Sequence, residues 1–227
     1  LFVGTSTSQG YFTNFGRTRR EGIELGAAAE IGALSLRADY GYVKASYQSA
    51  ACLLAANNST RGQTAACTAG GQDDEILVQA GNRIPGIPLH SLKLGADWHA
   101  STDWTLSADL VAYSSQYLRG NENNAHQPGA TADLLGGGPR NFLGAGTAPG
   151  YAVLNLATRV KLDSRWQLSA RINNLLDRRY ATAGALAENA FNAAGVFQTN
   201  SDDWTRESFY APGAPRSIFI AVNLSLD

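Results

Sequence analysis

The sequence predicts an all-β fold, specifically an antiparallel transmembrane β-barrel, and three observations support this prediction. Apolar residues occupy every second position in several segments, which is the pattern of strands with one apolar face. The opposite positions carry charged side chains, which suit a wet barrel interior better than the dry centre of a soluble sandwich. The connections also alternate between short turns and long loops, as they do in outer-membrane barrels.

The composition is compatible with a membrane barrel. Charged residues make up 16% of the chain and glycines number 24 of 227, against about 25% charged residues and about 7% glycine in ordinary soluble domains. The net charge of -1 provides no basic field for nucleic acid. No run of 18 apolar residues offers a transmembrane helix, so any membrane-spanning role has to fall to strands.

The first predicted hairpin covers residues 22–42, with a tight turn at Gly32. Its apolar stripe consists of Ile23, Leu25, Ala27, Ala29, Ile31, Leu34, Leu36, Ala38, Tyr40 and Tyr42. Its other face carries Glu24, Glu30, Arg37 and Asp39. An antiparallel pair with one apolar and one charged face is expected from this alternation.

Two more hairpins and a final strand show the same alternation. Residues 92–98 and 104–112 form the second hairpin, residues 154–162 and 166–172 form the third, and Arg216–Asp227 form the last strand. These segments give seven strands, and Leu1–Val3 are a candidate end of an eighth. Trp98, Trp104 and Trp166 lie beside the short turns, whereas Tyr40 and Tyr42 lie towards the other end, as two aromatic girdles at the membrane interfaces would.

Three connections are long, at about thirty to forty residues each: Lys44–Arg83, Arg119–Pro149 and Ala181–Pro215. We predict them to be structureless extracellular loops. Soluble domains rarely contain three such loops.

Several motifs, taken in order, resemble the C-terminal part of a TonB-dependent outer-membrane receptor. They are Asn14 followed by Gly22-Ile23-Glu24-Leu25, then Ile84-Pro85-Gly86-Ile87-Pro88-Leu89-His90, then Asn174-Leu175-Leu176-Asp177-Arg178-Arg179-Tyr180, and finally Gly213-Ala214-Pro215-Arg216. Each motif alone is weak, but their order and spacing cover nearly the whole chain.

The resemblance implies a barrel of 22 strands around an N-terminal plug, with residues 1–227 forming about the last third and the plug absent from this chain. Its function would be active import of a scarce ligand, such as a ferric siderophore, across the outer membrane, powered by the TonB-ExbB-ExbD complex. Lipid and a small-molecule ligand are the other partners. A passive porin or small structural barrel of about eight strands is the runner-up, and a barrel enzyme is third.

The ends of the chain carry two expectations. The sequence contains no Met, so Leu1 is expected to be a cut or processed end. Strands of this receptor family usually finish on an aromatic residue, whereas this chain stops at Asp227. We therefore predict a terminal Phe or similar residue at the next outward position of the natural chain.

Cys52 and Cys67 are the only two cysteines and both lie in the first long loop. We predict a structural disulfide, which an oxidising periplasm would form. A metal-binding pair and two free thiols are the alternatives.

No residue pattern identifies a catalytic centre, a cofactor or a metal site. His90, His99 and His126 lie on different segments and are expected to be surface or lumen residues. Asp73-Asp74-Glu75 and Asp202-Asp203 are acidic clusters that could hold calcium, although solvated loops are the simpler interpretation. Gly136-Gly137-Gly138 lacks the strand-to-helix setting of a phosphate loop and is interpreted as flexible loop. No nucleophile elbow or Ser/His/Asp grouping is visible.

Ligand capture is expected to fall to the long loops and the upper inner wall. The candidate residues are aromatic or hydrogen-bonding side chains at the outer ends of strands or in loops, namely Tyr113, Tyr117, Arg119, Trp204, Arg206 and Tyr210, with Asn121 and Asn123 beside them. Packing of these loop residues on one another is the alternative.

Overall fold

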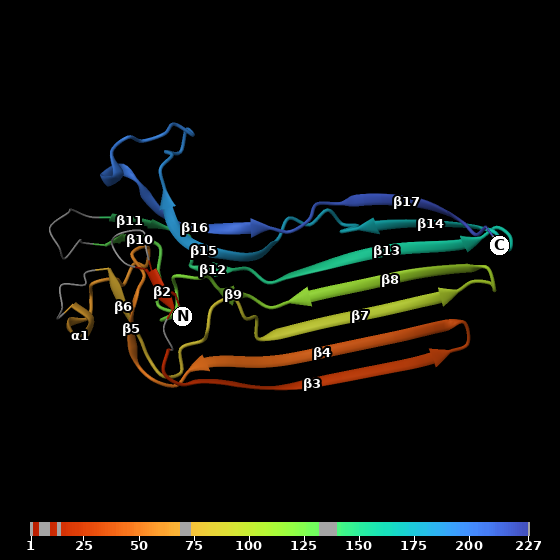
Figure 1. Ribbon diagram of the computed structural model, residues 1–227, viewed down its shortest axis with the longest axis horizontal. Coiled ribbons are helices and arrows are strands. Elements are labelled where there is room, and N and C mark those ends of the chain that lie inside the picture. The colour runs from red at the N-terminus through yellow and green to blue at the C-terminus, as the bar shows by residue number, and fades with distance from the viewer. Residues whose placement is uncertain (1, 5–9, 13–14, 69–73, 132–139, 227) are drawn as a thin grey trace.

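The main feature of the fold is a seven-stranded antiparallel sheet, which we call the wall (Figure 1). The structure is a computed structural model and describes residues 2–4, 10–12, 15–68, 74–131 and 140–226. The strand order is β17-β14-β13-β8-β7-β4-β3. These strands are β3 (Thr18–Ile31), β4 (Leu34–Tyr47), β7 (His90–His99), β8 (Trp104–Tyr113), β13 (Tyr151–Lys161), β14 (Trp166–Asn173) and β17 (Ser217–Leu224). All seven predicted strands are therefore confirmed.

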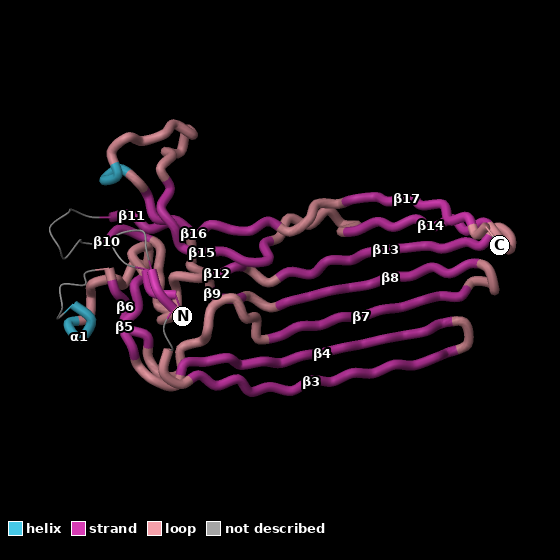
Figure 2. Tube along the Cα trace, in the orientation of Figure 1, coloured by secondary structure: helices cyan, strands magenta, loops and turns pink. Residues whose placement is uncertain are grey.

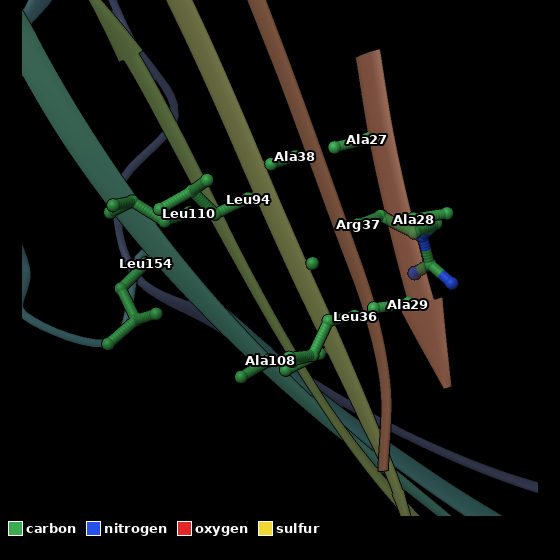
Figure 3. Close-up of a pocket in the computed structure, with 12 residues that line it drawn as sticks. Ala27, Ala28, Ala29, Leu36, Arg37, Ala38, Leu94, Ala108, Leu110 and Leu154 are labelled. Atoms are coloured by element: carbon green, nitrogen blue, oxygen red, sulfur yellow. The ribbon is translucent and has the colours of Figure 1, made fainter. Parts of the chain in front are cut away.

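The register of the wall places the alternating apolar residues on one face. Leu94 on β7 lies opposite both Ala38 on β4 and Leu110 on β8, and Leu110 in turn lies opposite Leu154 on β13. These residues line a shallow, almost entirely apolar hollow of about 460 Å³ (Figure 3). Large side chains on this face are exposed, for example 73% of Ile220. Extended apolar surface of this kind marks a face that meets a partner or a membrane.

The opposite face of the wall is polar and hydrogen-bonded, as the sequence predicts. Arg37 Nη1 donates to Asp97 Oδ2 at 2.7 Å, and Ser107 Oγ donates to Asp97 Oδ1 at 2.5 Å. His99 lies 3.3 Å from the hydroxyls of both Ser35 and Thr105. This face can therefore border water.

Local side-chain hydrogen bonds fix the short turns at one end of the wall. Gly32 has a φ of +60°, which glycine adopts without steric cost. Ser101 Oγ accepts from the backbone N–H groups of Asp103 and Trp104, and Asp163 Oδ1 accepts from those of Arg165 and Trp166. Such Asx and Ser turns close hairpins tightly, so Trp104 and Trp166 begin their strands directly beside the turns.

Aromatic side chains cluster at both ends of the apolar face. The rings of Trp98 and Trp104 lie 6.1 Å apart near the short turns. Towards the other end, Tyr40 Oη lies 2.8 Å from His90 Nδ1, and the ring of Tyr42 lies 5.3 Å from that of His90. His90 thus belongs to the apolar face with the tyrosines.

The three long connections are not structureless, which corrects the prediction made for them. With the outer end of β4 they form a packed region that we call the cap (Figures 1 and 2). It contains β5 (Ala51–Leu54), α1 (Ala65–Thr68), β6 (Glu75–Val78), β9 (Gln116–Tyr117), β10 (Gly129–Thr131), β11 (Arg140–Leu143), β12 (Thr147–Ala148), β15 (Ala181–Asn189), the 3-10 turn η1 (Ser201–Asp203) and β16 (Thr205–Pro212). Its strands are short and pair with segments distant in sequence, so they are not visible as an alternating pattern in the sequence.

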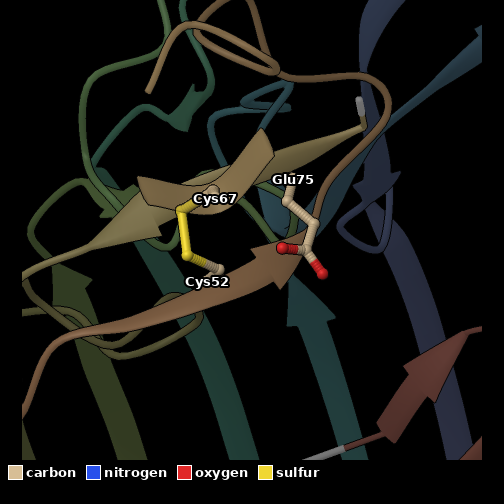
Figure 4. A group of neighbouring side chains, drawn as sticks. All are labelled: Cys52, Cys67 and Glu75. Atoms are coloured by element: carbon tan, nitrogen blue, oxygen red, sulfur yellow. A yellow bond between two sulfur atoms is a disulfide. The ribbon is translucent and has the colours of Figure 1, made fainter. Parts of the chain in front are cut away.

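Most of the buried apolar side chains lie in the cap rather than in the wall. One cluster consists of Tyr47, Leu53, Ala55, Ile76 and Val78, with Phe15 and Ile84 packed against it. Cys52 on β5 forms a disulfide with Cys67 on α1, with the two Cα atoms 5.4 Å apart (Figure 4). The core of this chain therefore fixes the cap, and the wall is stabilised by its ladder of hydrogen bonds.

The wall is an open sheet. β3 and β17 are its two edge strands, and they are not paired to each other within the described residues. The predicted eighth strand does not extend the wall: β1 (Phe2–Gly4) pairs with β2 (Gly10–Phe12) instead, and Leu1 lies outside the described residues. Among the described residues, no helix has the length and apolar character needed to cross a membrane.

Candidate ligand-binding surface

Three tyrosines form a row on the polar face of the wall, at its cap end. Tyr113 on β8 lies directly opposite Tyr151 on β13, with ring centroids 5.5 Å apart. The ring of Tyr180, which precedes β15, lies 4.6 Å from that of Tyr151. The row offers three amphipathic rings side by side, and such side chains bind ligands through both apolar contact and hydrogen bonds.

The motif at residues 174–180 fixes Tyr180 in this row. Asn174 adopts a φ of +50°, and its Nδ2 donates to the carbonyls of Arg178 and Ala214. The N–H of Gly213 donates to the Tyr180 carbonyl at 2.8 Å, and a Cβ at Gly213 would overlap the Tyr180 ring. Two of the motifs that carry the family resemblance therefore contact each other, and glycine is needed at 213 because the ring covers it.

A cavity of about 600 Å³ lies within the cap and has a mixed polar lining. Its lining includes Glu75 on β6 and Asn57, Arg119 and Glu122 from the loops, together with Cys52 of the disulfide. Two carboxylates and one guanidinium around one cavity favour a ligand that donates hydrogen bonds. The cavity is a second candidate for ligand contact besides the tyrosine row.

Burial affects both carboxylates of this cavity. Desolvation raises the pKa of Glu122, and a hydrogen bond of 3.0 Å from the Gly120 N–H partly offsets this. Desolvation also raises the pKa of Glu75. Burial penalises the charged form of a carboxyl group, so both groups hold their protons more tightly than they do in water.

We expect Glu122→Gln to stabilise the cap at pH 7. A carboxyl group whose pKa is raised in the folded state contributes stability below its ordinary pKa, and this contribution is lost as pH rises through the raised value. Glutamine keeps the acceptor for Gly120 without the charge, so the gain should vanish near about pH 4. Proteolytic susceptibility of the cap at both pH values measures this. Glu24→Gln on the exposed face of β3 is the matched control, and an equal gain at both pH values would contradict the explanation.

Asparagine side chains hold the loops of the cap together. Asn58 is fully buried, and its Nδ2 donates to the Gly120 carbonyl at 2.8 Å. Asn121 Nδ2 donates to the Gly146 carbonyl at 3.0 Å. Asn123 Nδ2 donates to Thr60 Oγ1 at 2.7 Å. Of the two asparagines predicted beside the ligand candidates, Asn123 therefore connects two loops, whereas Asn121 joins two parts of the second long connection.

The structure separates the predicted ligand residues into different environments. Tyr113 lies in the tyrosine row, and Arg119 is exposed beside the cap cavity. Tyr117 is half-buried under the guanidinium of Arg83, whose Cζ lies 5.2 Å from the ring centroid. Only Tyr113 and Arg119 of the predicted set thus belong to the two candidate surfaces.

The other three predicted ligand residues lie in the third cap segment. Trp204 Nε1 donates to the Gln198 carbonyl within the same loop. Tyr210 is 44% exposed, and its hydroxyl donates to the Thr147 carbonyl at 3.3 Å. Arg206 is 4% exposed and pairs with Glu188. The prediction that Arg206 meets an incoming ligand does not fit this burial.

The histidines also differ in environment. His99 lies on the polar face of the wall, as predicted, and His90 is exposed on the apolar face. His126 is only 2% exposed and lies edge-on to Phe142, with centroids 5.9 Å apart. The prediction of a surface or lumen position is wrong for His126, because the folding of the loops around it buries the ring.

The described residues place one set of metal-ligating side chains together. Ligand atoms of Cys52, Cys67 and Glu75 lie within 4.8 Å of one another (Figure 4). The two sulfurs are bonded to each other, so they are not thiolate ligands. Asp74 pairs with Arg61, and Asp203 lies in the 3-10 turn η1. Asp73 and the glycines at 136–138 lie outside the described residues.

Sequence reasoning missed several residues of these surfaces. Tyr151 begins β13 and occupies one of the alternate positions that face the polar side of the wall. This position in the alternation could have identified it as a candidate. Tyr180 ends the motif that carries the resemblance. Glu75 and Glu122 carried no usable signal, because the cavity between them forms only when two loops pack.

A family model described as "TonB dependent receptor-like, beta-barrel" matches residues 2–175. No curated protein matches the sequence. Three solved structures show the same fold: the siderophore receptor PiuA from Acinetobacter baumannii, the closed form of the ferric-catecholate import receptor Fiu from E. coli K12, and the ferric citrate transporter FecA in its unliganded form.

The likeness to these structures is one of fold at low identity. PiuA is 18% identical with a TM-score of 0.56, and the match covers 98% of this chain and 24% of PiuA. Fiu is 16% identical with a TM-score of 0.54, covering 98% and 23%. FecA is 18% identical with a TM-score of 0.52, covering 91% and 24%. The chain thus spans about a quarter of the length of these proteins.

The family match covers most of the wall and the first two segments of the cap. It also agrees with the open antiparallel sheet and its two contrasting faces. The family is one of receptors and not of enzymes, as predicted from the lack of a catalytic pattern. The chain belongs to the TonB-dependent receptor β-barrel family.

Proposed function

We propose that the chain is the C-terminal part of an outer-membrane receptor that imports a scarce ligand with energy supplied through TonB. The open wall is the observation that carries this proposal. Among the described residues, no strand pairs with the outer side of the edge strands β3 and β17, and a membrane requires every backbone polar group to be paired. Further strands of a larger barrel would satisfy them, and a 22-stranded barrel of the family is the proposed whole.

The two faces of the wall support the membrane assignment. Exposed apolar side chains with aromatic residues at both ends suit contact with lipid, whereas the ion-paired polar face suits a water-filled lumen. The runner-up, a complete barrel of about eight strands, would need its two edge strands to meet, and β3 and β17 are not paired to each other within the described residues.

A ferric siderophore is the proposed ligand class. Two of the similar structures, a ferric-catecholate import receptor and a siderophore receptor, support this class for proteins of the same fold. The TonB-ExbB-ExbD complex is the proposed energy-transducing partner and would act through parts of the receptor outside this chain. The net charge of -1 favours no nucleic-acid partner.

The tyrosine row is the proposed contact surface of this chain for the ligand. Tyr113, Tyr151 and Tyr180 lie on the lumen face below the cap, where an entering ligand would pass. Tyrosine is frequent among residues that dominate binding energy, because its ring offers a large contact area and its hydroxyl fixes orientation.

We expect Tyr113→Ala combined with Tyr151→Ala to weaken ligand binding by about ten-fold or more, a loss typical of dominant contact residues. The intact receptor is expressed in cells lacking competing importers, and binding and uptake of radioactive ferric siderophores are measured. Tyr40→Ala with Tyr42→Ala, on the apolar face of β4, is the matched control and should leave binding unchanged. Equal affinity of both double variants would exclude the tyrosine row.

A second measurement distinguishes TonB-dependent import from passive diffusion. Deletion of TonB should abolish uptake and leave binding at the cell surface intact. Uptake that persists without TonB, together with ion conductance of the purified protein in planar bilayers, would instead identify a passive pore.

A further inference from the structure

The polar face of the wall contains a small hollow where β8, β13, β14 and β17 run side by side (Figure 1). Its lining includes Arg159 of β13, Arg171 of β14 and Phe219 of β17. The register places all three on the same face as Ser107, which belongs to the polar side. The volume is about 210 Å³, below the range of about 300–1,000 Å³ that is typical of pockets for drug-sized ligands. The hollow therefore suits one small ring or anion.

The register also brings the two guanidinium groups to neighbouring positions. Arg159 lies opposite Ser169 on β14, and Arg171 is two residues further along that strand. Diagonal neighbours of this kind are about 7–8 Å apart and within reach of each other's long side chains. One anion in the hollow can therefore contact both arginines.

Neither arginine has a partner within the described residues. No ion pair or side-chain hydrogen bond involves Arg159 or Arg171 in that part of the chain. Among the described residues that line the hollow, none is acidic. Lys161 and Asp103 stand at the adjacent turns outside the hollow, and their charges cancel. The hollow thus carries two positive charges without a counter-charge of its own.

An aromatic ring and a hydroxyl group complete the hollow. Phe219 lies opposite Arg171, and 58% of it is exposed although it stands on the polar face. The hydroxyl of Ser169 has no hydrogen-bond partner within the described residues. A guanidinium fork matches the two oxygens of a carboxylate, and an exposed ring offers a surface for another ring. This combination favours a ligand that carries a carboxylate on an aromatic ring.

We propose that Arg159, Arg171 and Phe219 bind an aromatic carboxylate in this hollow. The carboxylate would lie between the two guanidinium groups, and its ring would pack against Phe219. Arg159 is eight residues from Tyr151 on the same strand, about 27 Å at about 3.4 Å per residue. The hollow is thus a second contact on the face of the tyrosine row, nearer the short turns. Its role in import rests on the proposed function, which it extends to an anionic, aromatic class of ligand.

The test is isothermal titration of the intact receptor in detergent with sodium benzoate, at neutral pH and constant ionic strength. We expect saturable binding by wild type, weakened about ten-fold or more by Arg159→Gln combined with Arg171→Gln. Lys93→Gln combined with Lys161→Gln is the matched control, because it removes two positive charges from the same face outside the hollow. Its benzoate binding should equal that of wild type.

Two further probes separate the ring from the charge. Acetate lacks the ring and benzyl alcohol lacks the charge, so both should bind more weakly than benzoate. Phe219→Leu keeps an apolar side chain on β17 without the ring, and it should weaken benzoate binding several-fold while leaving acetate binding unchanged. Two solvated arginines beside an unrelated phenylalanine predict instead no saturable benzoate binding by wild type up to about 50 mM. That result, or equal benzoate binding by wild type and the double arginine variant, would overturn the proposal.

Uptake measured with and without TonB keeps this proposal distinct from the proposed function. Uptake that persists without TonB, together with benzoate binding that depends on the two arginines, would overturn TonB-dependent import and leave the binding site standing. TonB-dependent uptake without benzoate binding would overturn the binding site alone.

Discussion

Replacing both Cys52 and Cys67 with serine is expected to destabilise the folded cap by about 3 kcal/mol while leaving the wall intact. The bridge joins β5 to α1 across a sequence separation of 15. A bridge of this length restricts the conformations of the loop far more when the cap is unfolded than when it is folded. Its loss lets β5, β6 and α1 separate more often, because the local apolar cluster is small.

Hydrogen exchange of the β5 and β6 amides in the intact receptor measures this effect. A loss of about 3 kcal/mol raises their exchange rate on the order of a hundred-fold, and the β7 and β8 amides of the wall keep theirs. Ala51→Ser with Ala66→Ser adds two hydroxyls beside the same positions and serves as the control. Similar exchange in both double variants would mean that side-chain packing, and not the bridge, holds the first cap segment.

The wall was predictable because each of its strands carries its own signal. Leu92, Leu94, Ala96 and Trp98 face one side whatever their neighbours are, since alternation is a property of the extended backbone. The register follows from the need to keep this stripe on one face. Strand ends were less certain: the predicted last strand ran to Asp227, whereas β17 ends at Leu224.

The cap was not predictable by the same means, because its order arises from contacts between distant segments. Asn58 is buried only because Gly120 and Asn123 come from a loop more than sixty residues away to accept its hydrogen bonds. Asparagine and glycine in a loop normally indicate a turn exposed to solvent. The same reasoning applies to Arg206, which is buried because β11 pairs with β16.

The candidate ligand surface was predictable only in part. The inward phase of β8 identified Tyr113. Its partner Tyr151 becomes relevant only when β8 and β13 are known to be neighbours, and Tyr180 only when the 174–180 motif is known to turn back onto the wall. A ligand surface in a barrel is shared between strands, so a single strand shows only its own residue.

A charged side chain on the apolar face of β17 should destabilise the folded protein in the membrane, even though the side chain at that position is exposed. Ile220 is 73% exposed, so Ile220→Arg would be nearly neutral if this face met water. If the face meets lipid, we expect the free energy of unfolding of the variant to fall by roughly 2–4 kcal/mol, the cost of an arginine near the bilayer midplane. Ala221→Arg places the same charge one residue further on, on the lumen face, and should be tolerated. Unfolding by guanidinium in lipid vesicles compares the two intact receptors. Equal stability of the two variants would contradict the membrane assignment of the wall. Only contact of one face with lipid would make arginine destabilising on that face and tolerated on the other.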